Sequence, residues 1–142
     1  MSHTFYILER TWQNAEMGQQ TLRHMIDRTY DAAFERLLRR QLHEYRSVSR
    51  SVRRKMALAG VDPRPIGCMQ RCMTAMAMRC NLLIDRTPSH MAEMLMQGNA
   101  MGIIDVQKSL RAYPRAAQSA AQLAERLLEV ECKAFDELSV FL

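Results

Sequence analysis

The chain contains few of the residues that build turns and β-sheets. Its 142 residues include five glycines, four prolines and only 6% aromatic residues, whereas 48% of its residues are hydrophobic. A β-rich domain needs many turn residues, and its strands are rich in aromatic and β-branched side chains, so this composition argues against one. Abundant alanine, leucine and methionine favour long helices instead. The sequence therefore predicts an all-α protein, and residues 1–142 fit a single domain.

The sequence also has no long uncharged stretch. The longest one near the middle, residues 94–104, is much shorter than the roughly 20 apolar residues that span a bilayer. Residues 1–10 lack a basic segment followed by an apolar run, and Glu9 and Arg10 interrupt them, so we recognise no secretory signal. We therefore expect a cytoplasmic protein without a membrane partner.

Apolar residues recur three and four positions apart in five segments, which predicts five helices. These helices span residues 4–27, 30–59, 65–85, 88–112 and 115–142. Gly60 is suited to end the second helix, and Thr87 followed by Pro88 is suited to begin the fourth. The long connection between the second and fourth helices contains a helix itself, which predicts a four-helix bundle with one crossover.

Four of these helices each carry one glutamate on or beside the apolar stripe: Glu16, Glu44, Glu93 and Glu131. Burying an unpaired carboxylate costs several kcal/mol, so this pattern indicates shared counter-charges, a bound metal or a solvated channel. His90, three residues before Glu93, adds an imidazole. Together the five residues form a candidate site for iron or manganese, with bridging glutamates and His90 as a terminal ligand.

Two interpretations of these acids need no metal. Glu93 lies in the first turns of its helix, where an acid also favours the helix dipole, while Glu16 and Glu131 could pair with arginines at the surface. Alternatively, Asp105 could form a buried polar network with Gln41 and Gln97. No motif for nucleophilic catalysis is present, so the sequence assigns no catalytic residue and does not decide whether the protein is an enzyme.

Three segments carry a family resemblance: residues 14–18 (Asn-Ala-Glu-Met-Gly), 90–94 (His-Met-Ala-Glu-Met) and 97–105 (Gln-Gly-Asn-Ala-Met-Gly-Ile-Ile-Asp). With the helix order, they make the chain resemble the ferritin-like superfamily, in particular small bacterial bundles of unassigned activity. That family holds metal with glutamates and Glu-x-x-His pairs. Here Ser47 and Ala134 stand three residues after Glu44 and Glu131. The resemblance thus implies the bundle, with a weak or degenerate metal site.

Sulfur-containing residues crowd the predicted helix 65–85. A soft-metal site for Cu(I) could use Cys68, Met69, Cys72, Met73 and Cys80. Packing of flexible methionines and small cysteines against the bundle is the simpler interpretation, with the cysteines reduced in the cytoplasm. An exposed part of this helix would serve as an adaptable contact surface, so we expect a homodimer.

Basic residues gather on the predicted helix 30–59. They are Arg36, Arg39, Arg40, Arg46, Arg50, Arg53, Arg54 and Lys55, and they contribute to a net charge of +5. Such a stripe can follow a phosphate backbone, but no recognition motif accompanies it, so binding of nucleic acid is not favoured. A solvated face that pairs with neighbouring acids, or one that binds a protein partner in a non-enzymatic scaffold, explains it as well.

Overall fold

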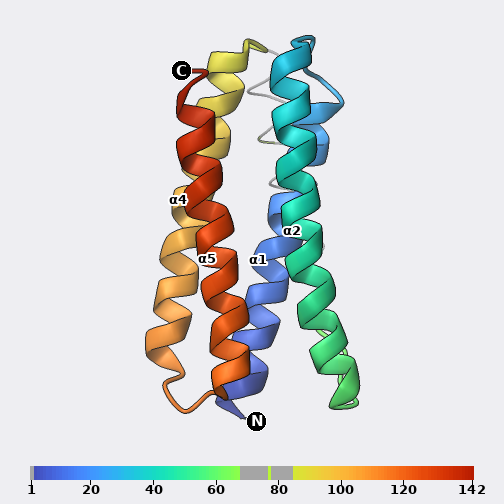
Figure 1. Ribbon diagram of the computed structural model, residues 1–142, viewed down its shortest axis with the longest axis vertical. Helices are drawn as coiled ribbons and strands as arrows, with labels where there is room; N and C mark the ends of the chain where they lie inside the picture. The colour runs from blue at the N-terminus through green and yellow to red at the C-terminus, as the bar shows by residue number, and fades with distance from the viewer. Residues whose placement is uncertain (1, 68–76, 78–84) are drawn as a thin grey trace.

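The computed structural model describes residues 2–67, 77 and 85–142. This part of the chain holds four helices and no strand: α1 (His3–Ile26), α2 (Ala32–Leu58), α4 (Pro88–Ala112) and α5 (Gln118–Ser139). They lie side by side as an elongated bundle (Figure 1). The prediction of an all-α fold is confirmed. No helix in the described ranges is long and apolar enough to cross a membrane.

The helices form two antiparallel hairpins. α1 packs on α2 and α4 packs on α5, and the hairpins meet where α1 contacts α4 and α5 and where α2 contacts α5. α2 and α4 run in the same direction, from the top of the view to the bottom (Figure 1). The end of α2 and the start of α4 therefore lie at opposite ends of the bundle (Figure 1).

Side-chain caps set the starts of three helices. Ser2, Asp31 and Thr87 each accept a hydrogen bond from the backbone N–H three residues later, which satisfies one of the free donors of the first turn. The Asp31 cap explains why α2 begins at residue 32 and not at residue 30. α5 begins at residue 118, later than the expected 115, because the Thr4 hydroxyl accepts the Ala117 N–H before the helix starts.

Gly60 ends α2 as predicted. Its φ of 75° is the left-handed conformation that glycine adopts without strain. The Val61 N–H then donates to the carbonyl of Met56 at 3.0 Å, which closes the helix end.

The chain remains non-helical through residues 61–67, so the expected start of a helix at residue 65 is wrong. The extended segment is held against α1, because Gln13 donates to the carbonyl of Arg64 at 3.0 Å. Ala77 is helical, and the other residues of the predicted helix, 68–76 and 78–84, lie outside the described part of the chain.

The core follows the predicted stripes. Large buried side chains come from all four helices, among them Ile7, Phe34, Leu38, Met91 and Leu127. Phe34 also meets Phe141 edge to face, with ring centroids 5.0 Å apart, near the end of α5. Polar side chains interrupt this apolar interior in the middle of the bundle, and they define the candidate site.

Candidate functional site

A cavity of about 630 Å³ lies between α1 and α4. This volume is within the range of small-molecule sites, about 300–1,000 Å³. Its walls come from α1, α4 and the segment after α2: Arg10, Gln13, Asn14, Met17, Gly18, Thr21, Leu22, Pro65, Ile66, Gly67, Leu95, Gly98, Asn99, Met101, Gly102, Ile104, Asp105 and Lys108. Gln41 and Tyr45 of α2 and Glu131 of α5 also line it.

Glu131 is the most unusual residue of this cavity. It occupies the inner stripe of α5, between the fully buried Leu127 and Ala134, and only 4% of its surface is exposed. Of the two interpretations of Glu131, the position on the inner stripe is confirmed and the position at the surface is wrong. No Lys, Arg or His of the described chain forms an ion pair with it, so the partners that the described residues give its carboxyl group are neutral.

Two neutral donors face one oxygen of Glu131. The Tyr45 hydroxyl donates to Oε2 at 2.7 Å. The amide nitrogen of Asn99 lies 2.9 Å from the same oxygen, in the orientation that also lets the Asn99 oxygen accept the Phe135 N–H at 3.3 Å. Because Tyr45 lies on α2 and Asn99 on α4, the buried acid of α5 connects three helices.

Burial dominates the acid–base chemistry of this group. It raises the pKa of the Glu131 carboxyl from 4.5 to about 8, although the hydrogen bond from Tyr45 acts in the opposite direction. The pKa of Tyr45 is also raised well above 10, first by burial and then by the charge of Glu131. At neutral pH the carboxyl group is therefore mainly protonated, and a nearby cation would favour its ionised form.

Gly102 makes room for the Glu131 side chain. A Cβ atom at this position would lie 2.8 Å from Oε1 of Glu131, closer than packed atoms allow. A Cβ at Gly98, one helical turn earlier, would meet no atom of the described residues within 4 Å, although Gly98 lines the same cavity. The glycine pair of α4 therefore admits a carboxyl group at one position and leaves open space at the other.

An ion pair and a hydrogen bond join α1 to α4 along the cavity wall. Arg10 of α1 pairs with Asp105 of α4. Asn14 donates to the other Asp105 oxygen at 2.6 Å. All three residues and the exposed Lys108 line the cavity, so its outer part is mixed in charge, whereas its inner part holds the single acid Glu131.

The structure does not bring the other predicted metal ligands to this acid. Glu93 is exposed, because the inner face of α4 is formed by Met91, Ala92 and Leu95, so its expected place beside the core is wrong. Glu16 is half-buried on α1 and does not line the cavity.

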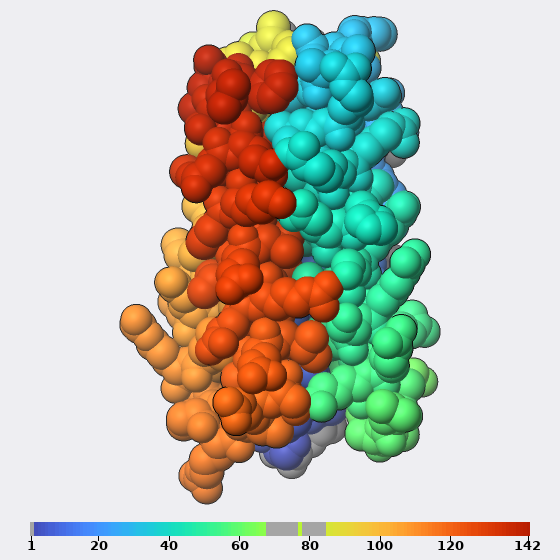
Figure 2. Space-filling view, viewed as in Figure 1, coloured from blue at the N-terminus to red at the C-terminus, as the bar shows by residue number. Residues whose placement is uncertain are grey.

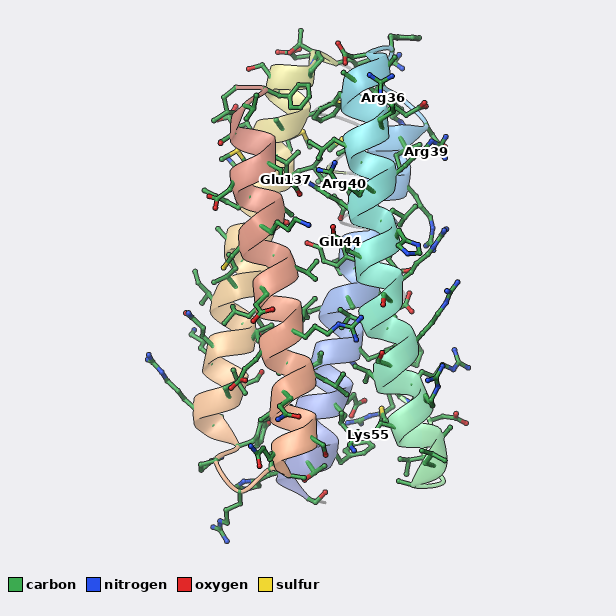
Figure 3. The ribbon with its side chains drawn as sticks, viewed as in Figure 1. Arg36, Arg39, Arg40, Glu44, Lys55 and Glu137 are labelled. Carbon is green, nitrogen blue, oxygen red and sulfur yellow. The ribbon has the colours of Figure 1, made fainter. Side chains whose placement is uncertain are left out.

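Glu44 faces α5 and not the interior. Its carboxylate accepts from Lys133 at 3.0 Å at the edge of the α2–α5 interface (Figure 3). His90 sits in the first turn of α4, where its Nε2 is buried without a hydrogen-bond partner. Neither residue lies in the cavity lining.

The described residues do not fit a carboxylate metal centre. They contain no group of three or more His, Cys, Asp or Glu that could hold a metal ion. The sequence of residues 68–84 contains no Asp, Glu or His. Iron and manganese prefer several oxygen or imidazole ligands, and around Glu131 the contacts are a phenol and an amide.

The soft-metal candidates Cys68, Met69, Cys72, Met73 and Cys80 all lie outside the described residues. The remaining cysteine, Cys132, is an exposed free thiol on α5.

The basic face of α2 is exposed and only partly paired. Arg40 pairs with Glu137 of α5, and Arg39 with Glu35 one turn away (Figure 3). The α2 and α5 side chains meet along the seam between the two helices on this side of the bundle (Figure 2). This arrangement matches the expectation of a solvated face that pairs with neighbouring acids.

Sequence reasoning missed three important polar residues. Tyr45 and Asn99 lie at inward positions of α2 and α4, and the helical spacing of Leu95, Asn99 and Gly102 was the signal that could have identified the second of them. Of the expected network, Gln41 is buried, Asp105 is half-buried and Gln97 is exposed.

The third is Glu9, which is also buried. Its Oε1 accepts from Arg64 Nε at 2.8 Å and from the Arg64 backbone N–H at 3.3 Å. This pair attaches the segment after α2 to α1, so it positions Pro65 and Ile66 at the cavity wall.

No protein-family model matches the chain, and neither a curated protein nor a solved structure is similar to it.

Proposed function

We propose that this protein is a ferritin-like helical bundle that binds a small molecule in the cavity between α1 and α4. The observation that carries the proposal is a cavity of about 630 Å³ whose inner end holds the buried Glu131 with its partners Tyr45 and Asn99. Small-molecule sites combine apolar walls with a few well-placed polar groups. Met17, Leu22 and Leu95 supply apolar wall here.

The ferritin-like assignment is supported by the directions of the helices and by the long connection between α2 and α4. The proposal uses this architecture without the metal chemistry of that family, because the ligands around Glu131 do not suit it. Binding is the activity that the proposal assigns to the cavity.

A fragment screen by ligand-observed NMR tests the proposal. The matched variants are Gly98→Leu, which adds a side chain at an exposed position of the cavity lining, and Gln97→Leu, which adds the same side chain at a neighbouring exposed position outside that lining. Fragments should bind the native protein and the Gln97→Leu variant. Their binding to the Gly98→Leu variant should be mostly or wholly lost. Equal binding by all three proteins would reject the cavity as the site.

The Gly98→Leu variant is expected to fold. Replacing glycine within a helix improves helix propensity by about 1 kcal/mol, and the position has open space. Circular dichroism and thermal unfolding of the two leucine variants provide the control for folding.

The proposal also includes a cytoplasmic homodimer. The exposed free thiol of Cys132 suits a reducing compartment. Sedimentation velocity of the purified chain measures the oligomeric state, and a monomer at all concentrations would remove the dimer from the proposal.

A further inference from the structure

We propose that the ligand of this cavity is an organic ammonium ion with an apolar body, whose charged nitrogen pairs with Glu131. This inference rests on the proposed function and names the chemical class of the ligand. Three features of the site carry it: the missing counter-charge, the two donors on one carboxyl oxygen, and the apolar wall that leads to them.

The first feature is that the described residues supply no cation to Glu131. A buried carboxylate is normally paired or neutral, because removing its charge from water costs several kcal/mol. Within the described chain, Arg10 pairs with Asp105 at the cavity wall and Arg64 pairs with Glu9. Glu131 forms no ion pair with a described residue, so a cationic ligand would supply the charge that the described site lacks.

The second feature is the arrangement of donors. Tyr45 O–H and Asn99 N–H both point at Oε2 of Glu131, a pattern that stabilises the ionised carboxylate. No described residue donates a hydrogen bond to Oε1. This oxygen lies beside Gly102, which has no Cβ atom. A ligand N–H at that oxygen would complete the coordination of the carboxylate.

The third feature selects against small hydrated cations. The cavity wall near the acid includes Leu22 and Leu95, and Met101 and Ile104 extend the apolar surface outward. The described residues form no group of three or more His, Cys, Asp or Glu for a metal ion, whereas an alkyl or aryl body would bury apolar surface at about 25 cal/mol per Å². An amphiphilic monoamine can place its ammonium group at Glu131 and its apolar body along this wall.

Binding of such a cation has a defined proton balance. When the ammonium ion enters at neutral pH, the mainly protonated Glu131 releases its proton to solvent and the two groups form a hydrogen-bonded ion pair. Among the described residues, the other charged or titratable groups at the cavity are Tyr45 on α2, Asp105 and Lys108 on α4, and Arg10 on α1.

The experiment compares three probes of similar size: 4-phenylbutylamine, 4-phenylbutan-1-ol and 4-phenylbutyrate. Their dissociation constants are measured by calorimetry for the native chain, for Glu131→Gln and for Gly98→Leu. We expect the amine to bind the native protein about tenfold or more tightly than the alcohol, since one added ion pair in a buried site supplies this much. The affinity for the amine should rise by up to about tenfold per pH unit from pH 6 to 7.5, as Glu131 becomes easier to ionise.

The variants separate this inference from the proposed function. Glu131→Gln should reduce the preference for amine over alcohol to about one, while it retains the alcohol affinity. An equal or higher native affinity for the alcohol would overturn the ammonium assignment and leave the cavity as a binding site. A preference for 4-phenylbutyrate would overturn it as well, because recognition would then belong to Arg10 and Lys108. If none of the probes binds and Gly98→Leu changes nothing in the fragment screen, the proposed function itself fails.

Discussion

The Tyr45 hydroxyl lies 2.7 Å from Oε2 of Glu131 and connects the first helical hairpin to the second through the interior. Both side chains are buried, and each alters the ionisation of the other. A hydroxyl–carboxyl contact of this kind is strong when the acid is charged and weaker when it is neutral. The stability of the bundle should therefore depend on the protonation of one glutamate.

Raising the pH should destabilise the native protein through Glu131. The folded pKa of about 8 exceeds the unfolded value of 4.5, so the native state binds more protons between these values. The contribution of Glu131 to the free energy of unfolding is complete below about pH 4.5 and is lost as the pH rises to about 8, at no more than about 1.4 kcal/mol per pH unit.

Urea unfolding at pH 5, 7 and 9 measures this dependence. Glu131→Gln should flatten the curve and become relatively more stable at pH 9, whereas Glu129→Gln, an exposed change on the same helix, should retain the native slope. An identical pH dependence in the native chain and in Glu131→Gln would contradict a raised pKa.

Removing the Tyr45 hydroxyl should raise the pKa of Glu131 further. The hydrogen bond from Tyr45 lowers this pKa, whereas burial raises it. Tyr45→Phe removes the hydrogen bond and keeps the effect of burial. NMR titration of the side-chain carboxyl carbon in protein labelled at glutamate compares the two proteins. A lower or unchanged midpoint in Tyr45→Phe would show that the hydroxyl does not act on the carboxylate.

Alanine substitutions at two glycines should have opposite effects on stability. A Cβ at Gly18 would lie 2.7 Å from the Tyr45 ring, which is rigid and buried, so Gly18→Ala should destabilise the protein by about 1–3 kcal/mol. Gly98→Ala meets no atom of the described residues within 4 Å and should stabilise it by about 0.5–1 kcal/mol through helix propensity. Chemical denaturation gives both values, and a stabilising Gly18→Ala would mean that the Tyr45 ring moves freely.

The Glu9–Arg64 pair should protect the segment after α2. Arg64→Ala removes the guanidinium from a buried carboxylate, so unfolding should become easier and the amide N–H of residue 64 should exchange faster with solvent. Glu9→Gln combined with Arg64→Ala should recover part of the lost stability, because no unpaired buried charge remains. Native-state hydrogen exchange and urea unfolding supply the measurements. Additive losses in the double variant would exclude coupling between the two side chains.

Local sequence signals predicted the helices well. Thr87 with Pro88 marked the start of α4, and Gly60 marked the end of α2, because these residues act on the adjacent backbone alone. The ends of α5 were harder to predict. The turn before it is held by Thr4, more than 100 positions away, and periodicity carries no information about that contact.

The site was predicted only in part for a related reason. A helical stripe indicates which face a residue occupies, so Glu131, between Leu127 and Ala134, was placed correctly. Glu44 lies close to the apolar stripe of α2, but its carboxylate accepts a hydrogen bond from Lys133 at the edge of the α2–α5 interface. A long flexible side chain can leave the interior in this way. The partners of Glu131 come from two other helices, and their depth depends on the register between helices, which one sequence does not reveal.

The contact between Tyr45 and Glu131 also bears on the order in which the chain folds. The contacts within each hairpin join segments that follow closely in the sequence, whereas Tyr45 and Glu131 are 86 positions apart. Local pairs of helices assemble early and distant pairs later in folding, as chain closure demands. The hydroxyl–carboxyl contact therefore belongs to the docking of two preformed halves, so its loss should accelerate unfolding and leave the refolding rate almost unaltered.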